Sequence, residues 1–305
     1  MYCQANQGPH RTTNMRIHHL NCGTLRPVGR RLLTGEGGWR ESSRLVSHCL
    51  LLEGRQGLAL IGSGLGTRDV SHPDSLSPMF HGTFRPRLLM METALHQVRE
   101  LGFDPHDIKH IVLTHLDQDQ AGGLADFPHA QVHVHAHELE AALRPRTLHD
   151  KVRYLAAQWA HQPHWISHQG GEGSWFGLKG ATALPDFDHQ VLLMPLPGHT
   201  AGHMGVAIQT STGWLLHAGD AYFYRGELDV TPSCPVGLKW LQWMMAHDHS
   251  QRIETLRRLR RLAHRFPDDI QITSSHDPVE FNLLSSQKRH RSTPLAVQES
   301  HQDAA

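Results

Sequence analysis

The stretch Ile111-Val-Leu-Thr-His115-Leu-Asp117-Gln-Asp119-Gln120-Ala-Gly-Gly123 decides how this chain folds. An apolar run typical of a buried strand leads directly into a cluster of metal-ligand side chains. In an extended segment residues two apart point the same way, so His115, Asp117 and Asp119 are expected to converge on one volume. The Gly-Gly pair that follows predicts a tight backbone turn before the next helix. Taken alone, the stretch would also fit ordinary turn and helix-cap residues.

Three later segments favour the metal-site interpretation, because each places a ligand-type residue just after an apolar run. They are Pro197-Gly198-His199-Thr200-Ala-Gly202-His203, His217-Ala-Gly219-Asp220-Ala and Ser274-Ser-His276-Asp277-Pro278. Histidine is the commonest metal ligand in proteins. Four such segments in this order are hard to obtain by chance, so we expect a metal centre built from strand ends.

Apolar periodicity predicts strands that come first and helices that are interleaved later. The strands are expected at Met15–Leu20, Leu45–Leu52, Leu58–Ile61, His110–Thr114, Gln131–His135, Val191–Leu196, Met204–Gln209, Trp214–His217 and Ile270–Ser274. Helices are expected at Arg87–Leu101, Ala136–Leu143 and His249–Phe266. Residues 144–190 are rich in Trp, His, Gly and Pro and are expected to form a long irregular insertion.

The length of 305 residues suits one large domain, which we place at residues 15–285. Residues 1–14 and 286–305 are polar and are expected to be disordered, and translation could also start at Met15. The first 14 residues lack the apolar stretch of a signal peptide. No apolar run approaches the roughly 20 residues that span a bilayer, so no membrane association is expected.

The balance of charge argues against a general nucleic-acid binder, because Lys+Arg and Asp+Glu are equal at 29 each. The basic run Arg257–Arg261 is interleaved with leucines at helical spacing, which predicts a solvated helix face. The four cysteines are far apart and form no C-x-x-C pair, which indicates neither a zinc knuckle nor a disulfide scaffold. A reducing, cytoplasmic location is therefore expected. The expected partner is a small molecule, and the oligomeric state stays open.

Together, these motifs resemble those of the metallo-β-lactamase superfamily. Its first motif is written H-x-H-x-D-H, and later motifs are a histidine in P-G-H-T, an aspartate in a G-D segment and a late histidine. The resemblance covers the chain from about Met15 to about Phe281. It implies an α/β fold, the four-layer αββα sandwich, with metals at one edge between the two sheets. A subset of the family reads H-L-D-x-D-H, and Asp117 fits that subset.

The resemblance also implies a set of ligands for two divalent metal ions. His115, Asp117 and His199 would hold the first ion. Asp119 and His276 would hold the second, and Asp220 would bridge both. Zinc is the expected metal, although the oxygen-rich ligand set would also suit Mn or Fe.

Two residues depart from the family pattern. Gln120 stands where the family has a histidine ligand for the second metal, and its neutral amide oxygen would be a weak ligand. Gly62, within Leu60-Ile-Gly-Ser-Gly64, stands where the family usually has an aspartate that supports the ligands. Loss of such a supporting partner costs about 10–100-fold in metal affinity or activity. The second position is therefore expected to be only partly occupied.

The function implied is metal-dependent hydrolysis of a small ester, lactone or related substrate through a metal-bound hydroxide. Asp119 and Asp220 are the expected catalytic residues, with Asp119 orienting the bridging water. Together with Asp117 they supply three negative charges against four from two divalent ions, and one hydroxide neutralises the remainder. The alternative is a degenerate family member that keeps the fold and acts as a binding protein with little catalysis. Gln120 and Gly62 are the features that favour this alternative.

Two further groups of residues are open to more than one interpretation. His133, His135 and His137 form an H-x-H-x-H run outside the family motifs, and we interpret them as surface or supporting residues. Lactonases of the superfamily place a tyrosine three residues after the bridging aspartate, where this chain has Phe223. Neighbouring tyrosines could substitute for it, and aromatic residues of the insertion could line a pocket or only anchor the loop; these are Tyr222, Tyr224, Trp159, Trp165, Trp175 and Phe176.

Overall fold

A computed structural model describes residues 15–54 and 57–287 of the chain. The expected N-terminal extension and most of the expected C-terminal tail lie outside these residues. The last helix, α10 (Pro278–Gln287), ends two residues beyond the predicted domain boundary at residue 285.

The first sheet has the strand order β1-β2-β3-β4-β5-β6. Strands β1, β2 and β3 pair antiparallel, whereas β3, β4, β5 and β6 run parallel. Their bounds are Arg16–Leu25, Leu45–Gly54, Gly57–Ile61, Ile108–Val112, Gln131–His135 and His164–His168. Helices occupy the parallel crossovers, as the connection between parallel strands requires.

The second sheet has the order β12-β11-β10-β9-β8-β7. It is antiparallel except for β12, which runs parallel to β11. The strands are Gly173–Trp175, Leu178–Ala183, Val191–Pro195, Met204–Thr210, Gly213–His217 and Ile270–Thr273, numbered β7 to β12.

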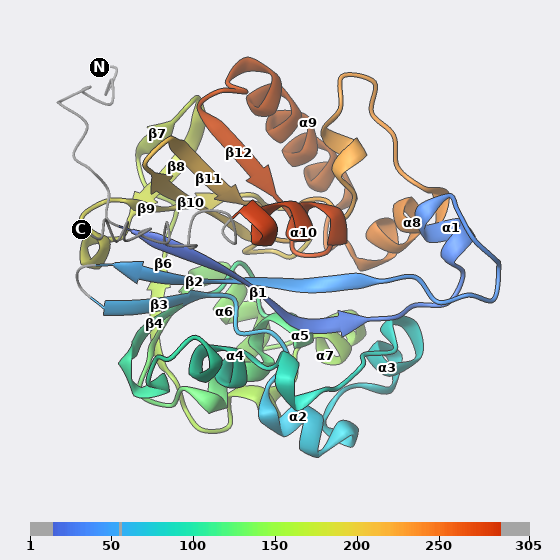
Figure 1. Ribbon diagram of the computed structural model, residues 1–305, viewed down its shortest axis with the longest axis horizontal. Coiled ribbons are helices and arrows are strands. Elements are labelled where there is room, and N and C mark those ends of the chain that lie inside the picture. The colour runs from blue at the N-terminus through green and yellow to red at the C-terminus, as the bar shows by residue number, and fades with distance from the viewer. Residues whose placement is uncertain (1–14, 55–56, 288–305) are drawn as a thin grey trace, which may run out of the picture.

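The two sheets stack face to face, and helices cover both outer faces (Figure 1). Apolar residues lie in three layers: Leu51, Leu60 and Ile111 beneath the first sheet, Leu50, Val112 and Val206 between the sheets, and Met194, Leu216 and Leu259 under the upper helix. Burying a leucine fully stabilises the fold by about 1.5–3 kcal/mol, so these layers dominate its stability. The predicted αββα sandwich is confirmed.

The helices below the first sheet are α2 (Thr67–Ser71), α3 (Pro78–Phe84), α4 (Ala94–Glu100), α5 (Gln118–Ala121), α6 (Ala136–Leu143) and α7 (Leu148–Arg153). On the other side lie α8 (Val236–Met245) and α9 (His249–Arg265). The short α1 (Arg30–Thr34) packs beside α8.

The predicted helix at Arg87–Leu101 is wrong in its first half. The helix begins only at Ala94, because Thr93 adopts an extended conformation and its side chain accepts a hydrogen bond from the His96 amide. A residue with this geometry is an N-cap, which fixes the start of a helix.

The predicted irregular insertion at residues 144–190 is also wrong, because it contains α7 and the strands β6, β7 and β8. β6 forms the edge of the first sheet, and β7 forms the edge of the second. Edge strands are short and partly exposed, so their sequences lack the apolar runs by which the inner strands are recognised.

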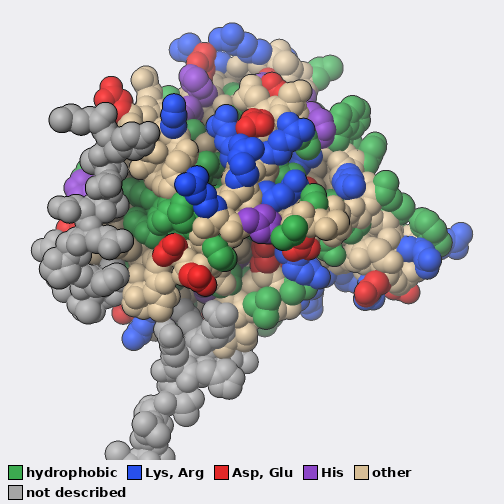
Figure 2. Space-filling view, turned by 90° about the horizontal axis from the view of Figure 1, so that it is seen from above, with side chains coloured by type: hydrophobic (Ala, Val, Ile, Leu, Met, Phe, Trp, Pro, Cys, Tyr) green, Lys and Arg blue, Asp and Glu red, His purple; other side chains and the backbone are tan. Residues whose placement is uncertain are grey.

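The basic run at Arg257–Arg261 lies on α9, as predicted. Leu256, Leu259 and Leu262 are buried, whereas Arg257, Arg258 and Arg261 form exposed ion pairs with Glu254. Figure 2 looks down on this side of the molecule and shows basic side chains gathered there. Within residues 15–54 and 57–287, no helix combines the length and apolarity needed to cross a bilayer.

Candidate metal centre

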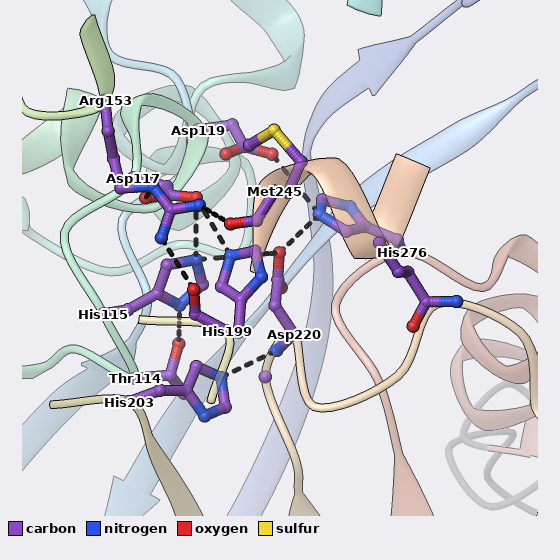
Figure 3. Close-up of polar contacts among 12 residues, drawn as sticks. Thr114, His115, Asp117, Asp119, Arg153, His199, His203, Asp220, Met245 and His276 are labelled. Atoms are coloured by element: carbon purple, nitrogen blue, oxygen red, sulfur yellow. Dashed lines mark hydrogen bonds and ion pairs between the residues drawn. The ribbon is translucent and has the colours of Figure 1, made fainter. Parts of the chain in front are cut away.

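Loops that leave one edge of the sandwich bring the sequence-predicted ligands together (Figure 3). His115 follows β4, His199 follows β9, Asp220 follows β11 and His276 follows β12. All four side chains are buried. Strand ends hold them in place because the sheets themselves fix where each loop begins.

Four of the residues form one compact group: the ligand atoms of His115, Asp117, His199 and Asp220 all lie within 4.8 Å of one another. His199 Nε2 is 3.0 Å from Asp117 Oδ2 and 3.5 Å from Asp220 Oδ2. His115 Nε2 is 3.6 Å from the same Asp220 oxygen. We call His115, Asp117 and His199 the first side of the centre.

The remaining predicted ligands lie on the opposite side of Asp220. His276 Nε2 is 2.9 Å from Asp220 Oδ2 and 3.8 Å from Asp119 Oδ2. We call Asp119, Gln120 and His276 the second side. Asp119 and Gln120 belong to the short helix α5 and not to an extended segment, so the expected alternation of side chains holds only as far as Asp117.

Several buried atoms of the centre fit a bound cation. Among the described residues, His115 Nε2 and Asp220 Oδ1 have no hydrogen-bond partner, although both are shielded from solvent. A buried polar atom without a partner costs about 1–3 kcal/mol, which a coordinated metal would remove. The atoms are ring nitrogen and carboxylate oxygen, which are the donors that zinc prefers.

The pKa values indicate the same need for positive charge. Burial alone would lower the pKa of His276, but Asp220 and Asp119 raise it to about 10. Burial would raise the pKa of Asp220, yet His276 and His115 hold it well below its usual range. In the metal-free chain these carboxylates therefore keep a proton on the neighbouring imidazole, and a divalent cation would supply that charge instead.

The first side is supported by residues from the segment that was expected to be irregular. Arg153 Nε lies 3.3 Å from Asp117 Oδ1, and the guanidinium also donates to the carbonyl oxygens of His199 (2.8 Å) and Met245. Burial would raise the pKa of Asp117, but Arg153 and His115 hold it well below its usual range. The buried Glu138 accepts hydrogen bonds from the Leu116 amide at 2.9 Å and the Gly202 amide at 3.1 Å.

Asp220 is supported through its backbone. Its amide donates to His203 Nε2 at 2.9 Å, while the other nitrogen of His203 lies 2.8 Å from the Leu196 carbonyl oxygen. His203 thus orients the loop after β11, and His199 is the histidine of that motif that faces the other ligands (Figure 3).

The side chain of Gln120 faces Gly62. The backbone carbonyl of Gln120 accepts hydrogen bonds from Ser63, but among the described residues neither atom of its buried amide group has a partner. A Cβ atom added to Gly62 would lie 3.0 Å from Gln120 Oε1 and 3.0 Å from Cys49 Sγ. The two departures from the family motifs are therefore neighbours, and the amide oxygen faces Gly62.

Asp119 is the most strongly perturbed carboxyl of the second side. Burial, opposed by His276 and reinforced by Asp220, raises its pKa to about 7. A metal-free Asp119 is thus close to half-protonated at neutral pH, which suits a group that accepts and returns a proton.

The Gly-Gly pair after the first motif, where a tight turn was expected, lies where α5 is followed by a 3₁₀ helix (Gly122–Asp126), and its conformation does not require glycine. The φ of Gly122 is −58°, which any residue can adopt. The pair is instead required by close packing, because a Cβ on Gly122 would lie 2.1 Å from Asp69 Oδ2 and one on Gly123 would lie 2.5 Å from the Ser63 carbonyl oxygen.

Above the ligands lies a pocket whose rim is largely apolar. It is lined by Asp117, Asp119, Asp220 and His276 at the base, and by Met79, Phe80, Phe84, Gln118, His149, Arg153, Phe223 and Met245. Phe223 occupies this rim, so the residue three positions after Asp220 does face the pocket. Tyr222 does not substitute for it, because its buried hydroxyl donates to Glu280 at 2.8 Å.

The aromatic residues of the insertion do not line this pocket. Trp159 packs with Trp165 in the core below the first sheet. Trp175 and Phe176 pack in the core near α9, where Phe176 contacts Phe266. They anchor the insertion, which is one of the two roles that the sequence allowed.

Sequence reasoning missed Arg153, Glu138 and His149. Arg153 and Glu138 support ligands from a distance in the sequence, and His149 contributes to the pocket wall. No spacing rule predicts such contacts. The one available signal was a set of charged residues placed on α6 and α7, next to the chain segments that carry the motifs.

Comparison with known proteins agrees with the motifs. Residues 43–276 match the sequence model of the metallo-beta-lactamase superfamily. A protein of Mycobacterium tuberculosis named "probable metallo-hydrolase" is 36% identical over 269 residues, which are 88% of this chain and 82% of that protein. An N-acyl homoserine lactonase of Bacillus thuringiensis is 28% identical over 187 residues, which are 59% of this chain and 66% of the lactonase.

Solved structures show the same fold at low sequence identity. An N-acyl homoserine lactone hydrolase with N-hexanoyl-L-homoserine at its catalytic metal centre matches with a TM-score of 0.63 and 20% identity, covering 89% of this chain and 96% of that one. The dizinc quorum-quenching lactonase AidC matches with a TM-score of 0.57 and 16% identity, covering 88% and 89%.

Proposed function

The chain belongs to the metallo-beta-lactamase superfamily and is a metal-dependent hydrolase, and we propose that its substrate is a lactone or small ester carrying an apolar substituent. The observation that carries this proposal is the buried ligand group at the base of a pocket with an apolar rim. The similarity to an N-acyl homoserine lactonase and to a lactone hydrolase supports the same bond type.

The residues have separate tasks in this proposal. His115, Asp117 and His199 hold one divalent ion, zinc being favoured by the donor set and by the dizinc relative, and Asp220 lies between the two sides. A bound divalent ion lowers the pKa of water and polarises a carbonyl oxygen. Asp119 takes the proton of the attacking water on its carboxylate and returns it to the departing alkoxide.

The rim residues select and hold the substrate. Phe80, Phe84 and Phe223 offer apolar surface to an acyl or alkyl group and exclude water from the base of the pocket. Phe223 has no hydroxyl, so the substrate carbonyl receives no hydrogen bond from that position. His149 is a polar side chain that lines the same pocket, whereas the guanidinium of Arg153 is already bound to Asp117, His199 and Met245.

Arg153 changes the charge balance in favour of a single tightly held ion. Its guanidinium pairs with Asp117 and so offsets one of the three carboxylate charges that would otherwise help to balance two divalent ions. A second ion would find only Asp119, His276 and a share of Asp220, since Gln120 faces Gly62. We propose that the first side binds zinc tightly and that the second side fills weakly.

A direct test measures hydrolysis of N-acyl homoserine lactones, simple γ-lactones and aryl esters by the purified chain. Activity is expected to disappear on chelation, to return with zinc and to be absent from the His115→Ala variant. Lack of hydrolysis above the level of His115→Ala for every substrate would contradict the proposal.

The unpartnered Gln120 amide supports a second candidate, a binding protein that retains the fold with little catalysis. The two candidates differ in the effect of substrate. Under this alternative, lactones or esters would bind and raise the melting temperature of the zinc-loaded chain without being consumed. Product formation at a rate that depends on zinc would exclude it.

A further inference from the structure

A second cluster of histidines lies on the first sheet, away from the metal centre. His110 on β4, His133 on β5 and His168 on β6 come from neighbouring parallel strands. His110 precedes His115 by five residues on an extended segment, which separates the two by up to roughly 16 Å. None of the three lines the pocket above the metal centre.

The three imidazoles interrupt an otherwise apolar layer. Val112, two residues after His110, packs between the sheets, whereas Ile111 packs below the first sheet. Side chains alternate along a strand, so His110 points into the space between the sheets. His133 alternates in the same way with Val132 and Val134, which pack below the sheet. His110 and His133 therefore both face the second sheet.

The contacts within the cluster are close and directional. His110 Nδ1 lies 3.0 Å from His133 Nε2, and the other nitrogen of His133 lies 3.0 Å from His168 Nε2. One carboxylate oxygen of Asp186, which precedes β9, and one ring nitrogen each of His110 and His133 lie within 4.8 Å of one another. Two nitrogens and one carboxylate oxygen thus converge from both sheets.

We propose that His110, His133 and Asp186 form a second binding site for a divalent transition-metal ion, with Zn²⁺ as the fitting occupant. Ligand atoms on a tetrahedral zinc ion lie roughly 3.3 Å apart, close to the 3.0 Å between the two histidine nitrogens. His168 holds the remaining nitrogen of His133, which is how ligating histidines are oriented in metal sites. Water would complete the coordination.

The chemical state of the histidines suits this role. Burial, reinforced by His110 and His168, lowers the pKa of His133 to about 3, and burial lowers the pKa of His110 below its usual value. Both rings are therefore neutral at pH 7, which is the form that coordinates metals. The half-exposed His110 and the exposed Asp186 leave a path from solvent to the site.

An ion bound at this site would cross-link the two sheets. His110 and His133 belong to the first sheet, and Asp186 lies in the connection between β8 and β9 of the second. A metal that binds only the folded chain stabilises it by mass action. The inference concerns a site separate from the catalytic one and does not depend on the proposed substrate.

The test uses the full chain carrying His115→Ala and His199→Ala, which removes the first side of the catalytic centre. After chelation and dialysis, the chain is titrated with Zn²⁺, and bound zinc is counted by elemental analysis while melting is followed. We expect one zinc per chain and a rise in Tm of roughly 5 °C. Adding His110→Asn or Asp186→Asn should abolish both effects, whereas the control His164→Asn, an exposed histidine on β6, should retain them.

A second measurement does not rely on the disabled catalytic centre. In the otherwise unchanged chain, Asp186→Asn should lower the zinc count by one and leave hydrolysis unaltered. Absence of zinc binding in the disabled chain would overturn the inference. Zinc binding that persists with both His110→Asn and Asp186→Asn would also overturn it.

Discussion

The two sides of the proposed metal centre share Asp220 but differ in the residues that support their side chains. On the first side, Asp117 is paired with a buried guanidinium, and the chain around His115 and His199 is held by Glu138 and Arg153. On the second side, the side chain of Gln120 has no partner among the described residues and faces Gly62. The two sides differ less in the type of ligand than in the hydrogen bonds and ion pairs that hold each ligand in place.

This difference traces to two neighbouring positions, the ligand position 120 and position 62, which would support it. Gln120 and Gly62 are far apart in the sequence, yet the two positions touch across the edge of the first sheet. An imidazole at position 120 would need a partner for its second nitrogen, and Gly62 offers no side chain. At position 120 the buried glutamine amide is likewise left without a partner among the described residues.

The largest effect is expected from removing a ligand of the first side. His199→Ala should lower hydrolysis by about 10⁴-fold, near 5 kcal/mol, because the metal would lose a ligand that the rest of the site cannot replace. Bound zinc should fall by one per chain. Steady-state kinetics and elemental analysis measure the two effects, and His203→Gln serves as a control that should retain zinc while lowering activity less.

The support of the first side can be broken without touching a ligand. Arg153→Met leaves the buried Asp117 carboxylate without its guanidinium partner, so the metal-free chain should lose about 4 kcal/mol of unfolding free energy. Zinc should restore much of this loss, because the ion supplies the missing charge. Urea unfolding with and without zinc measures the difference, and Arg153→Lys should lie between. Equal losses in both states would show that Arg153 acts only in packing.

The contrast between the two sides explains what the sequence could foretell. Five of the predicted ligands come shortly after an apolar strand, and short-range sequence patterns locate such positions. They are His115, Asp117, His199, Asp220 and His276. The inner strands and the long amphipathic α9 were predicted for the same reason. The order of the sandwich layers came from the family resemblance and not from periodicity.

What the sequence could not foretell depends on contacts between distant segments. Nothing near Arg153 indicates that it pairs with Asp117, and the same holds for the approach of Gly62 to Gln120. The edge strands β6 and β7 were missed because such strands carry polar residues that resemble a loop, and β8 beside β7 has no long apolar run. The role of His133 was also hidden, since its partner His168 lies on one of those missed strands.

A pH measurement would sharpen the comparison of the supporting residues. Glu280 accepts hydrogen bonds from the Ser274 amide and the Tyr222 hydroxyl, both at 2.8 Å, and so ties together the loops that carry His276 and Asp220. Burial, reinforced by Asp277, raises the pKa of Glu280 to about 7. In contrast to Asp117, this carboxyl is held in its protonated form.

The sign of the pH effect follows from the retained proton. Between about pH 4.5 and 7 the unfolded chain releases the proton of Glu280 while the folded chain keeps it, so the stability of the metal-free chain falls as pH rises. The full difference is about 3 kcal/mol. Glu280→Gln cannot ionise and should remove this part of the slope, as measured by urea unfolding across that range. An unchanged slope would mean that Glu280 is ionised in the folded chain.

Restoring the second side should have a smaller effect of opposite sign. Gln120→His together with Gly62→Asp provides an imidazole and a carboxylate for its second nitrogen, which should raise affinity for the second zinc by about 10–100-fold. Native mass spectrometry counts the ions. Gly62→Asp alone is the control and should give no gain, because position 120 still lacks an imidazole and the new carboxylate would meet the Gln120 amide oxygen. Two tightly bound zinc ions in a chain that carries Asp186→Asn, and so lacks the proposed site at His110 and His133, would contradict this view of the second side.

The smallest effect is expected from replacing Gln120, which stands at a position where the family has a metal ligand. If the Gln120 amide coordinates no metal, Gln120→Leu should leave zinc content and hydrolysis unchanged within about twofold, since no coordinating atom is removed. Replacing a buried amide that lacks partners with an apolar side chain of similar size should stabilise the chain by about 1 kcal/mol. Urea unfolding of the metal-free chain measures this gain. A ligand would behave in the opposite way, because its loss lowers affinity by at least tenfold. A fall in bound zinc in Gln120→Leu would therefore place the amide oxygen on the metal and make the two sides alike.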